Sequence, residues 1–295
     1  MAWSCMKQIF ATKLRIYLFG GIFLGFFTTC SIVDPAEDIP SYIHIDNITL
    51  SAIGNQGSSS AAITEAWIFM DGELVGGFEL PCTVPILAAG NHSFIIKGGV
   101  KMNGLTSTRA IYPSWKGWEG TLELTRGKIV NVNPSITYFP LIDFVNTWME
   151  NFETAGISLI PETNSSAIVV KDSIPYAFEG NTSAYIHLNN NDTTNFVGSS
   201  SIAYNMPAAN NTWIEFNYWS DTPFICGIVE ENNPNNRVQW VSVNPNWAWG
   251  KIYIRLTDAL ASATQNVNYK IYFAMENPSS QTESNLYLDN IKLLK

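Results

Sequence analysis

The stretch TWIEFNYWSD, Thr212–Asp221, carries the pattern that decides the fold of this chain. Side chains of a β-strand point alternately to its two faces, so residues two apart share a face. One face of this stretch would hold Ile214, Phe216 and Tyr218, and the other would hold Trp213, Glu215, Asn217 and Trp219. The stretch therefore predicts a strand with one face in an apolar core and a second face that is aromatic and polar.

Similar segments fill the chain from Asn151 to its end, separated by polar turns and without a helical period. They are AIVVKD, SAYIHLNN, SIAYNMP, FICGIVEE, RVQWVSVN, KIYIRLTDA, VNYKIYFAMEN and NLYLDNIKLL. Many short strands at regular spacing are typical of sandwich folds. We therefore expect residues 151–295 to form a jelly-roll β-sandwich.

The two ends of this region resemble a known family. The opening NFETAG, Asn151–Gly156, and the ending NLYLDNIKLL, Asn285–Leu294, resemble the first and last strands of jelly-roll carbohydrate-binding modules. The resemblance implies a galactose-binding-like fold, and only weakly implies that a sugar is bound. Some members hold a structural calcium between these strands, which would make Glu153 and Asp289 metal ligands together with carbonyl oxygens. Alternatively, Glu153 is exposed and Asp289 bonds to a turn.

The strand faces that point away from the core carry side chains suited to a sugar. Aromatic rings can cover the C–H face of a pyranose, and planar polar groups can bond its hydroxyls. The candidates for ligand binding are Trp213, Glu215, Asn217, Trp219, Tyr253, Arg255 and Tyr272, with Trp247 and Trp249 in the turn NPNWAWGK. The alternative is that cross-strand aromatic pairs stabilise these sheets without any ligand.

The region 41–140 predicts a separate immunoglobulin-like β-sandwich, joined to the second region by a close linker at 141–150. Asp71-Gly72 predicts a hairpin turn inside AWIFMDGELVGGFEL. The segment TLELTRGKIVNVNP predicts a second hairpin that turns at residues 126–128. Residues 68–100 resemble PEGA-like surface domains, which implies a β-sandwich on a cell-surface protein, no enzymatic activity and a structural role for His92.

The first 29 residues predict a signal peptide. The apolar run Ile16–Phe27 would span about 18 Å as a helix, which is short for a hydrocarbon core of about 30 Å. Basic residues precede the run and small residues follow it, as in secretory signals. Either Met1 or Met6 would serve as the start of such a leader.

The end of this leader, Phe27-Thr28-Thr29-Cys30, resembles the lipobox of Bacteroidetes-type lipoproteins, although Phe27 and Thr29 depart from the usual residues. The resemblance implies lipidation of Cys30, with residues 30–40 as a tether and the protein held at the outer membrane or cell surface. Several acyl chains would make such an anchor lasting. An ordinary cleaved signal or an uncleaved anchor are the alternatives.

The composition excludes some classes of function, disordered and nucleic-acid-binding proteins among them. Hydrophobic residues make up 46% of the 295 residues and charged residues only 14%, which indicates packed cores rather than disorder. The leader holds three basic residues and no acid, so the remainder is more acidic than the net charge of −9 for the whole chain. Nucleic-acid binding relies on basic contacts to phosphate, so we expect no nucleic-acid partner.

Motifs for catalysis are missing from the sequence. His44, His92 and His187 are isolated, and Cys82 and Cys226 are too far apart in sequence to indicate a disulfide framework. No pair of acids is singled out as the two carboxylates of a glycosidase. The sequence therefore predicts a non-enzymatic cell-envelope lipoprotein that binds glycan through its second sandwich. The alternative is a structural or adhesive subunit with protein partners.

Overall fold

The computed structural model describes residues 37–140, 142–173, 175–191 and 193–295. Residues 41–295 form one compact unit. The predicted signal peptide, Cys30 and the tether up to residue 36 lie outside the described residues. Within the described ranges, no helix is long and apolar enough to cross a membrane. The prediction of an all-β fold with β-sandwich architecture is confirmed.

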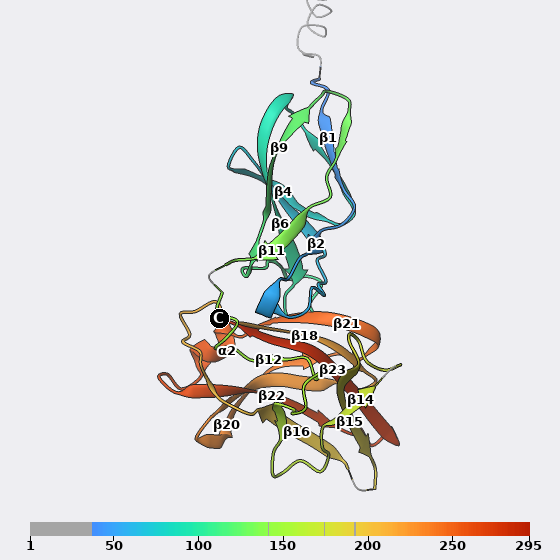
Figure 1. The fold of residues 1–295 in the computed structure, drawn as a ribbon, viewed down its shortest axis with the longest axis vertical. Helices are drawn as coiled ribbons and strands as arrows, with labels where there is room; N and C mark the ends of the chain where they lie inside the picture. Colours follow the sequence, from blue (N-terminus) through green and yellow to red (C-terminus); the bar gives the residue numbers. More distant parts are fainter. Residues whose placement is uncertain (1–36, 141, 174, 192) are drawn as a thin grey trace, which may run out of the picture. The chain divides into compact units, whose positions relative to one another are not determined.

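The first sandwich occupies the blue to green part of Figure 1. Its elements are β1 (Ser41–Ile45), β2 (Thr49–Leu50), η2 (Gly54–Gln56), β3 (Glu65–Met70), β4 (Glu73–Glu79), β5 (Cys82–Ile86), β6 (Gly90–Lys101), β7 (Arg109–Ile111), β8 (Trp115–Lys116), β9 (Trp118–Leu124), β10 (Ile129–Asn131) and β11 (Ser135–Tyr138). The largest sheet has the order β4-β3-β6-β7, with β9 also pairing with β6. The sheets β10-β1-β5 and β2-β11-β8 complete the sandwich.

The hairpin at Asp71-Gly72 is confirmed between β3 and β4. Both turn residues have positive φ, 50° and 89°, as a two-residue turn of this kind requires. His92 on β6 lies beside this turn, with its Nδ1 2.6 Å from a carboxylate oxygen of Asp71. Asp71 raises the pKa of His92, and the histidine supports the turn, as expected.

The predicted hairpin around residues 126–128 is wrong in its pairing. The turn exists, since Gly127 has a φ of 72° and the N–H of Lys128 donates to the carbonyl of Thr125 at 3.0 Å. However, β9 pairs with β6, whereas β10 pairs in parallel with β1. The turn therefore carries the chain from one layer of the sandwich to the other.

The second sandwich, coloured yellow-green to red in Figure 1, contains two sheets. Its elements are β12 (Met149–Glu150), β13 (Leu159–Pro161), β14 (Val170–Ser173), β15 (Thr182–Asn189), β16 (Asn195–Ser200), β17 (Tyr204–Asn205), β18 (Trp213–Ser220), β19 (Phe224–Glu230), β20 (Asn233–Val243), β21 (Asn246–Arg255), α2 (Thr257–Ser262), β22 (Asn268–Glu276) and β23 (Glu283–Leu294).

We name the two sheets after their central strands. The β23 sheet has the order β14-β15-β23-β18-β21, with β12 also pairing with β23. The β22 sheet has the order β13-β16-β22-β19-β20, with β17 also pairing with β22. Their inner faces supply a common core in which the rings of Phe216 and Phe273 meet edge to face, with centroids 5.1 Å apart. The thiol of Cys226 is buried in this core and free.

Helix α2 contradicts the prediction that this region lacks helix. It follows the end of β21, where the sequence pattern had extended the strand through the letters TDA. Ala259 and Leu260 are buried, and Asp258 in the first turn complements the positive end of the helix. A helix of six residues is too short to produce a visible period in the sequence.

The connection between the sandwiches is packed rather than free. Phe144 belongs to the core of the first sandwich, and Trp148 belongs to the core of the second. Asp143 accepts hydrogen bonds from the N–H groups of Val145 and Asn146 at 2.9 and 3.0 Å. These contacts fit the expected close junction, while the boundaries 41–140 and 151–295 stay a prediction.

Candidate functional site

Four predicted ligand residues lie in the junction between the sandwiches. Trp213, Glu215, Asn217 and Tyr253 point away from the second core, as expected, but each is at most 2% exposed. The first sandwich covers this part of the outer face of the β23 sheet. The prediction that these four side chains form an open sugar-binding face is therefore wrong. Their face of the sheet lies outside the core of the second sandwich, but the first sandwich covers it.

Hydrogen bonds across the junction fix the two sandwiches together. The hydroxyl of Tyr253 accepts the N–H of Ala62 at 3.0 Å, and the side-chain amide of Asn217 donates to Ser60 at 3.1 Å. Asn103 connects the β6–β7 loop to β21, since its side chain accepts the N–H of Arg255 at 2.9 Å. The predicted candidate Arg255 lies at the rim of this junction, with its guanidinium 2.6 Å from Asp258.

A buried ionic cluster lies inside the same junction. Glu215 is fully buried, with one carboxylate oxygen 3.0 Å from Nζ of Lys251 and 3.8 Å from Nζ of Lys292. Tyr138, from the first sandwich, donates to the same oxygen at 3.1 Å. Burial opposes ionisation of Glu215, but the two lysines outweigh it and the pKa of the carboxyl is lowered. Burial also lowers the pKa of Lys292 to about 8.

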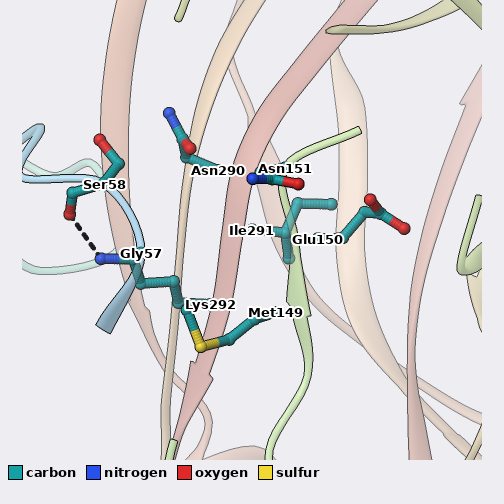
Figure 2. A pocket seen from close by; sticks show the side chains of 8 residues that line it. All are labelled: Gly57, Ser58, Met149, Glu150, Asn151, Asn290, Ile291 and Lys292. Carbon is teal, nitrogen blue, oxygen red and sulfur yellow. Dashed lines mark hydrogen bonds between the residues drawn. The ribbon is translucent and has the colours of Figure 1, made fainter. Parts of the chain in front are cut away.

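A small pocket lies beside this cluster (Figure 2). Its volume is about 140 Å³, and its lining combines Gly57 and Ser58 from the first sandwich with residues of β12 and β23. Figure 2 shows Nζ of Lys292 donating to the carbonyl oxygen of Ser58, at 2.7 Å. Ligand pockets usually measure about 300–1,000 Å³, so this pocket is too small for an oligosaccharide.

The two predicted calcium ligands hold a turn instead. Glu153 accepts the N–H groups of Asn181 and Thr182, both at 2.8 Å, and these bonds lower the pKa of its carboxyl. Asp289 accepts the hydroxyl of Ser183 at 2.7 Å, and burial raises its pKa to about 6.

The oxygens of these two carboxylates already accept hydrogen bonds, whereas a bound calcium ion would need them as ligands. Among the described residues, no group of three or more His, Cys, Asp or Glu side chains could hold a metal ion. As arranged here, Glu153 and Asp289 do not fit a calcium site.

The remaining tryptophan candidates lie on the open part of the β23 sheet. Trp219, Trp247 and Trp249 form one group with Tyr287. The centroids of Trp219 and Trp247 are 5.9 Å apart, and Trp247 is 71% exposed. Ligand binding by these three tryptophans stays a prediction.

Tyr272 lies on the opposite sheet, beneath a groove of about 800 Å³. The groove follows the outer face of the β22 sheet, where Ile225 pairs with Ala274 and Gly227 pairs with Tyr272. A Cβ atom at Gly227 would lie 2.7 Å from the Tyr272 ring, so glycine allows the ring to lie flat against the strand. The small residues Gly227 and Ala274 thus leave space for the groove on this face.

Polar side chains from β20 border the groove. The guanidinium carbon of Arg237 lies 5.4 Å from the centroid of the Tyr272 ring, and an ion pair with Glu162 holds it there. Gln239, opposite Gly227, is exposed at the groove. The hydroxyl of Tyr272 is buried and has no hydrogen-bond partner among the described residues. Burial raises the pKa of Tyr272 to about 12, although Arg237 opposes the rise.

Arg237, Gln239 and Glu162 were missed at the sequence level. The alternation of RVQWVSVN already separates Arg237 and Gln239 from Val238 and Trp240, so a signal existed for the first two. Their meeting with Tyr272 depends on the pairing of β20, β19 and β22, which the sequence does not display. Glu162 follows the short strand β13 and carries no local signal.

Comparisons with known proteins found similarity only to solved structures. No model of a known protein family matches the chain, and no curated protein is similar to it. A solved family 61 carbohydrate-binding module in complex with β-1,4-galactotriose is 17% identical, with a TM-score of 0.32 over 48% of this chain and 92% of its own. The family 11 carbohydrate-binding module of a Clostridium thermocellum cellulosomal cellulase is 15% identical, with a TM-score of 0.35 over 50% and 94%.

An adhesin domain is similar at the same level. The cleaved K2 adhesin domain of Lys-gingipain is 12% identical, with a TM-score of 0.36 over 50% of this chain and 98% of its own. At such identities the similarity concerns the β-sandwich fold alone. The ligand of this chain must therefore follow from its own side chains.

Proposed function

We propose that this protein binds glycan in the groove on the outer face of the β22 sheet. The observation that carries the proposal is the groove itself, which has a volume of about 800 Å³ and is lined by Tyr272, Arg237 and Gln239 beside small apolar side chains. Its volume lies within the range usual for ligand pockets, about 300–1,000 Å³.

The composition of the groove favours a sugar over an ionic or purely apolar ligand. Val197, Ile225 and Ala274 offer a small apolar surface for the C–H face of a pyranose. Gln239 offers an amide, and Arg237 offers guanidinium N–H groups whose charge Glu162 already balances. A neutral ligand suits this arrangement, because an added charge would disturb the existing ion pair.

Substitutions in the groove test the proposal. Ala274→Phe should fill the groove and lower oligosaccharide affinity at least 100-fold, because the ring would occupy the space of the ligand. Gln239→Ala removes about one hydrogen bond, worth roughly 1 kcal/mol, and should weaken binding by about fivefold. Isothermal titration with β-linked gluco-, manno-, galacto- and xylo-oligosaccharides measures both effects.

Asn232→Ala is the matched control, since Asn232 is exposed in the turn between β19 and β20 and does not line the groove. All three variants should melt within a few degrees of the unmodified protein. If the unmodified protein binds an oligosaccharide and Ala274→Phe binds it equally well, the groove is not the site. Binding of none of the four classes would contradict the glycan proposal itself.

We also propose that the protein is a lipoprotein of the cell envelope, anchored through Cys30. The support is the sequence of the leader and the acidic, Pro-containing segment that follows it. Mass spectrometry of the mature N-terminus should find acylated Cys30 as the first residue. An unmodified Cys30 would leave secretion by an ordinary signal as the better interpretation.

A further inference from the structure

A strip of aromatic side chains crosses the open part of the β23 sheet. We define the aromatic strip as Tyr176, Tyr185, Tyr287, Trp219, Trp247 and Trp249. The register of the sheet brings its centre together, since Tyr185 on β15 lies opposite Tyr287 on β23, which lies opposite Trp219 on β18. Residues far apart in sequence thus make one continuous surface.

Ring contacts link all members of the strip. Tyr287 is the hub: its centroid lies 4.6 Å from that of Tyr185, 5.8 Å from Tyr176, 5.7 Å from Trp219 and 6.2 Å from Trp249. The outer members are open to solvent, since Trp247 is 71% and Tyr176 is 55% exposed. Contiguous aromatic surface that is partly open to solvent is a feature of interaction sites.

Hydrogen bonds fix two of the rings before any ligand arrives. The hydroxyl of Tyr185 donates to Asn285 at 2.7 Å, and Asn285 donates to Asp221 at 2.8 Å. The hydroxyl of Tyr287 donates to Asp172 at 3.3 Å. Rings held in this way lose little freedom on binding, which favours affinity.

The acceptors bonded to the strip indicate the class of ligand. Asp172 and Asn285 accept hydrogen bonds from the hydroxyls of Tyr287 and Tyr185, and Asp221 accepts one from Asn285. A protein partner would have to remove water from the two carboxylates at a cost. Sugar hydroxyls would replace that water with new hydrogen bonds, while C–H groups contact the rings. The two carboxylates would repel sulfated or uronic-acid glycans.

We infer that the aromatic strip is a second binding site for neutral glycan. The inference rests on the proposed function, but it concerns the opposite sheet from the groove. The outer faces of two packed sheets point in opposite directions, so one molecule would engage two glycan segments at once. Linking two contacts in one molecule increases retention on a dense polysaccharide well beyond either contact alone.

Titration of the full chain in detergent with the same four oligosaccharide classes tests the inference. We expect two sites per chain in the unmodified protein. The double variant Trp247→Ala/Tyr176→Ala should lose one site, and Ala274→Phe should lose the other. Both strip positions are exposed, so the fold should be kept. The control Ile53→Ala/Leu87→Ala removes similarly exposed side chains from the first sandwich and should keep both sites.

The outcomes separate the two proposals. One site that disappears in Ala274→Phe and persists in the strip variant would overturn the strip as a glycan site while keeping the groove. One site with the reverse behaviour would keep the strip and overturn the groove. No binding at all would overturn both. A strip variant that keeps two glycan sites but loses self-association in sedimentation would identify a protein-docking surface instead.

Discussion

Glu215→Gln should destabilise the protein by about 3–5 kcal/mol, because it removes the counter-charge of buried lysines. Glu215 is fully buried, and Lys251 and Lys292 have side chains only 2% and 1% exposed. The glutamine keeps the shape of the side chain but leaves two ammonium groups facing a neutral amide. Urea unfolding at pH 7 measures the loss as a lower midpoint.

A control and a rescue make this prediction specific. Glu123 is exposed on β9, and Glu123→Gln should change stability by less than about 0.5 kcal/mol. The triple variant Glu215→Leu/Lys251→Met/Lys292→Met removes the charges together, and should recover much of the stability lost in Glu215→Gln. A loss below about 1 kcal/mol in Glu215→Gln would show that the lysines release their protons or reach water at little cost.

The cluster also gives the junction a pH dependence. The pKa of Lys292 in the folded protein is about 8, below its ordinary value of 10.5. Between these two values the unfolded chain binds more protons than the folded one, so this group makes stability rise with pH. Below pH 8 the lysine is charged in both states, and Glu215 and the carbonyl of Ser58 offset only part of the cost of its burial.

Much of the fold follows from local alternation in the sequence. Ile214 and Phe216 were assigned to a core by residue spacing alone, and both are fully buried. The turn at Asp71-Gly72 is equally predictable from the sequence, because the positive φ values of such a turn favour these residue types. Such features depend on neighbours within a few positions, which a single sequence displays.

The candidate site depends instead on long-range pairing. Alternation shows that Trp213 and Glu215 leave the second core, but it cannot show that the first sandwich covers them. Likewise, Tyr185, Tyr287 and Trp219 meet only because β15, β23 and β18 are neighbours in the sheet. Strand order and register are set by contacts between distant segments, so the strip and the groove were not predicted as units.

Trp213→Ala should destabilise the protein by about 3–5 kcal/mol without changing glycan affinity in the folded state. Trp213 belongs to β18 of the second sandwich, yet it packs in the core of the first. Its ring meets Tyr112 edge to face with centroids 5.2 Å apart, and its indole N–H donates to Asn211 at 2.8 Å. Truncation to alanine would leave a cavity at the junction and remove these contacts.

Trp247→Ala is the matched comparison, because it removes the same side chain from an exposed position. It should change stability by less than about 0.5 kcal/mol and weaken binding at the strip. Urea unfolding and oligosaccharide titration on both variants therefore give opposite patterns. Lost binding with unchanged stability in Trp213→Ala would mean that the junction opens to admit ligand. The expected pattern would instead establish that one outer face of the β23 sheet is divided, with its Trp213 end joining the sandwiches and its Trp247 end left for a ligand.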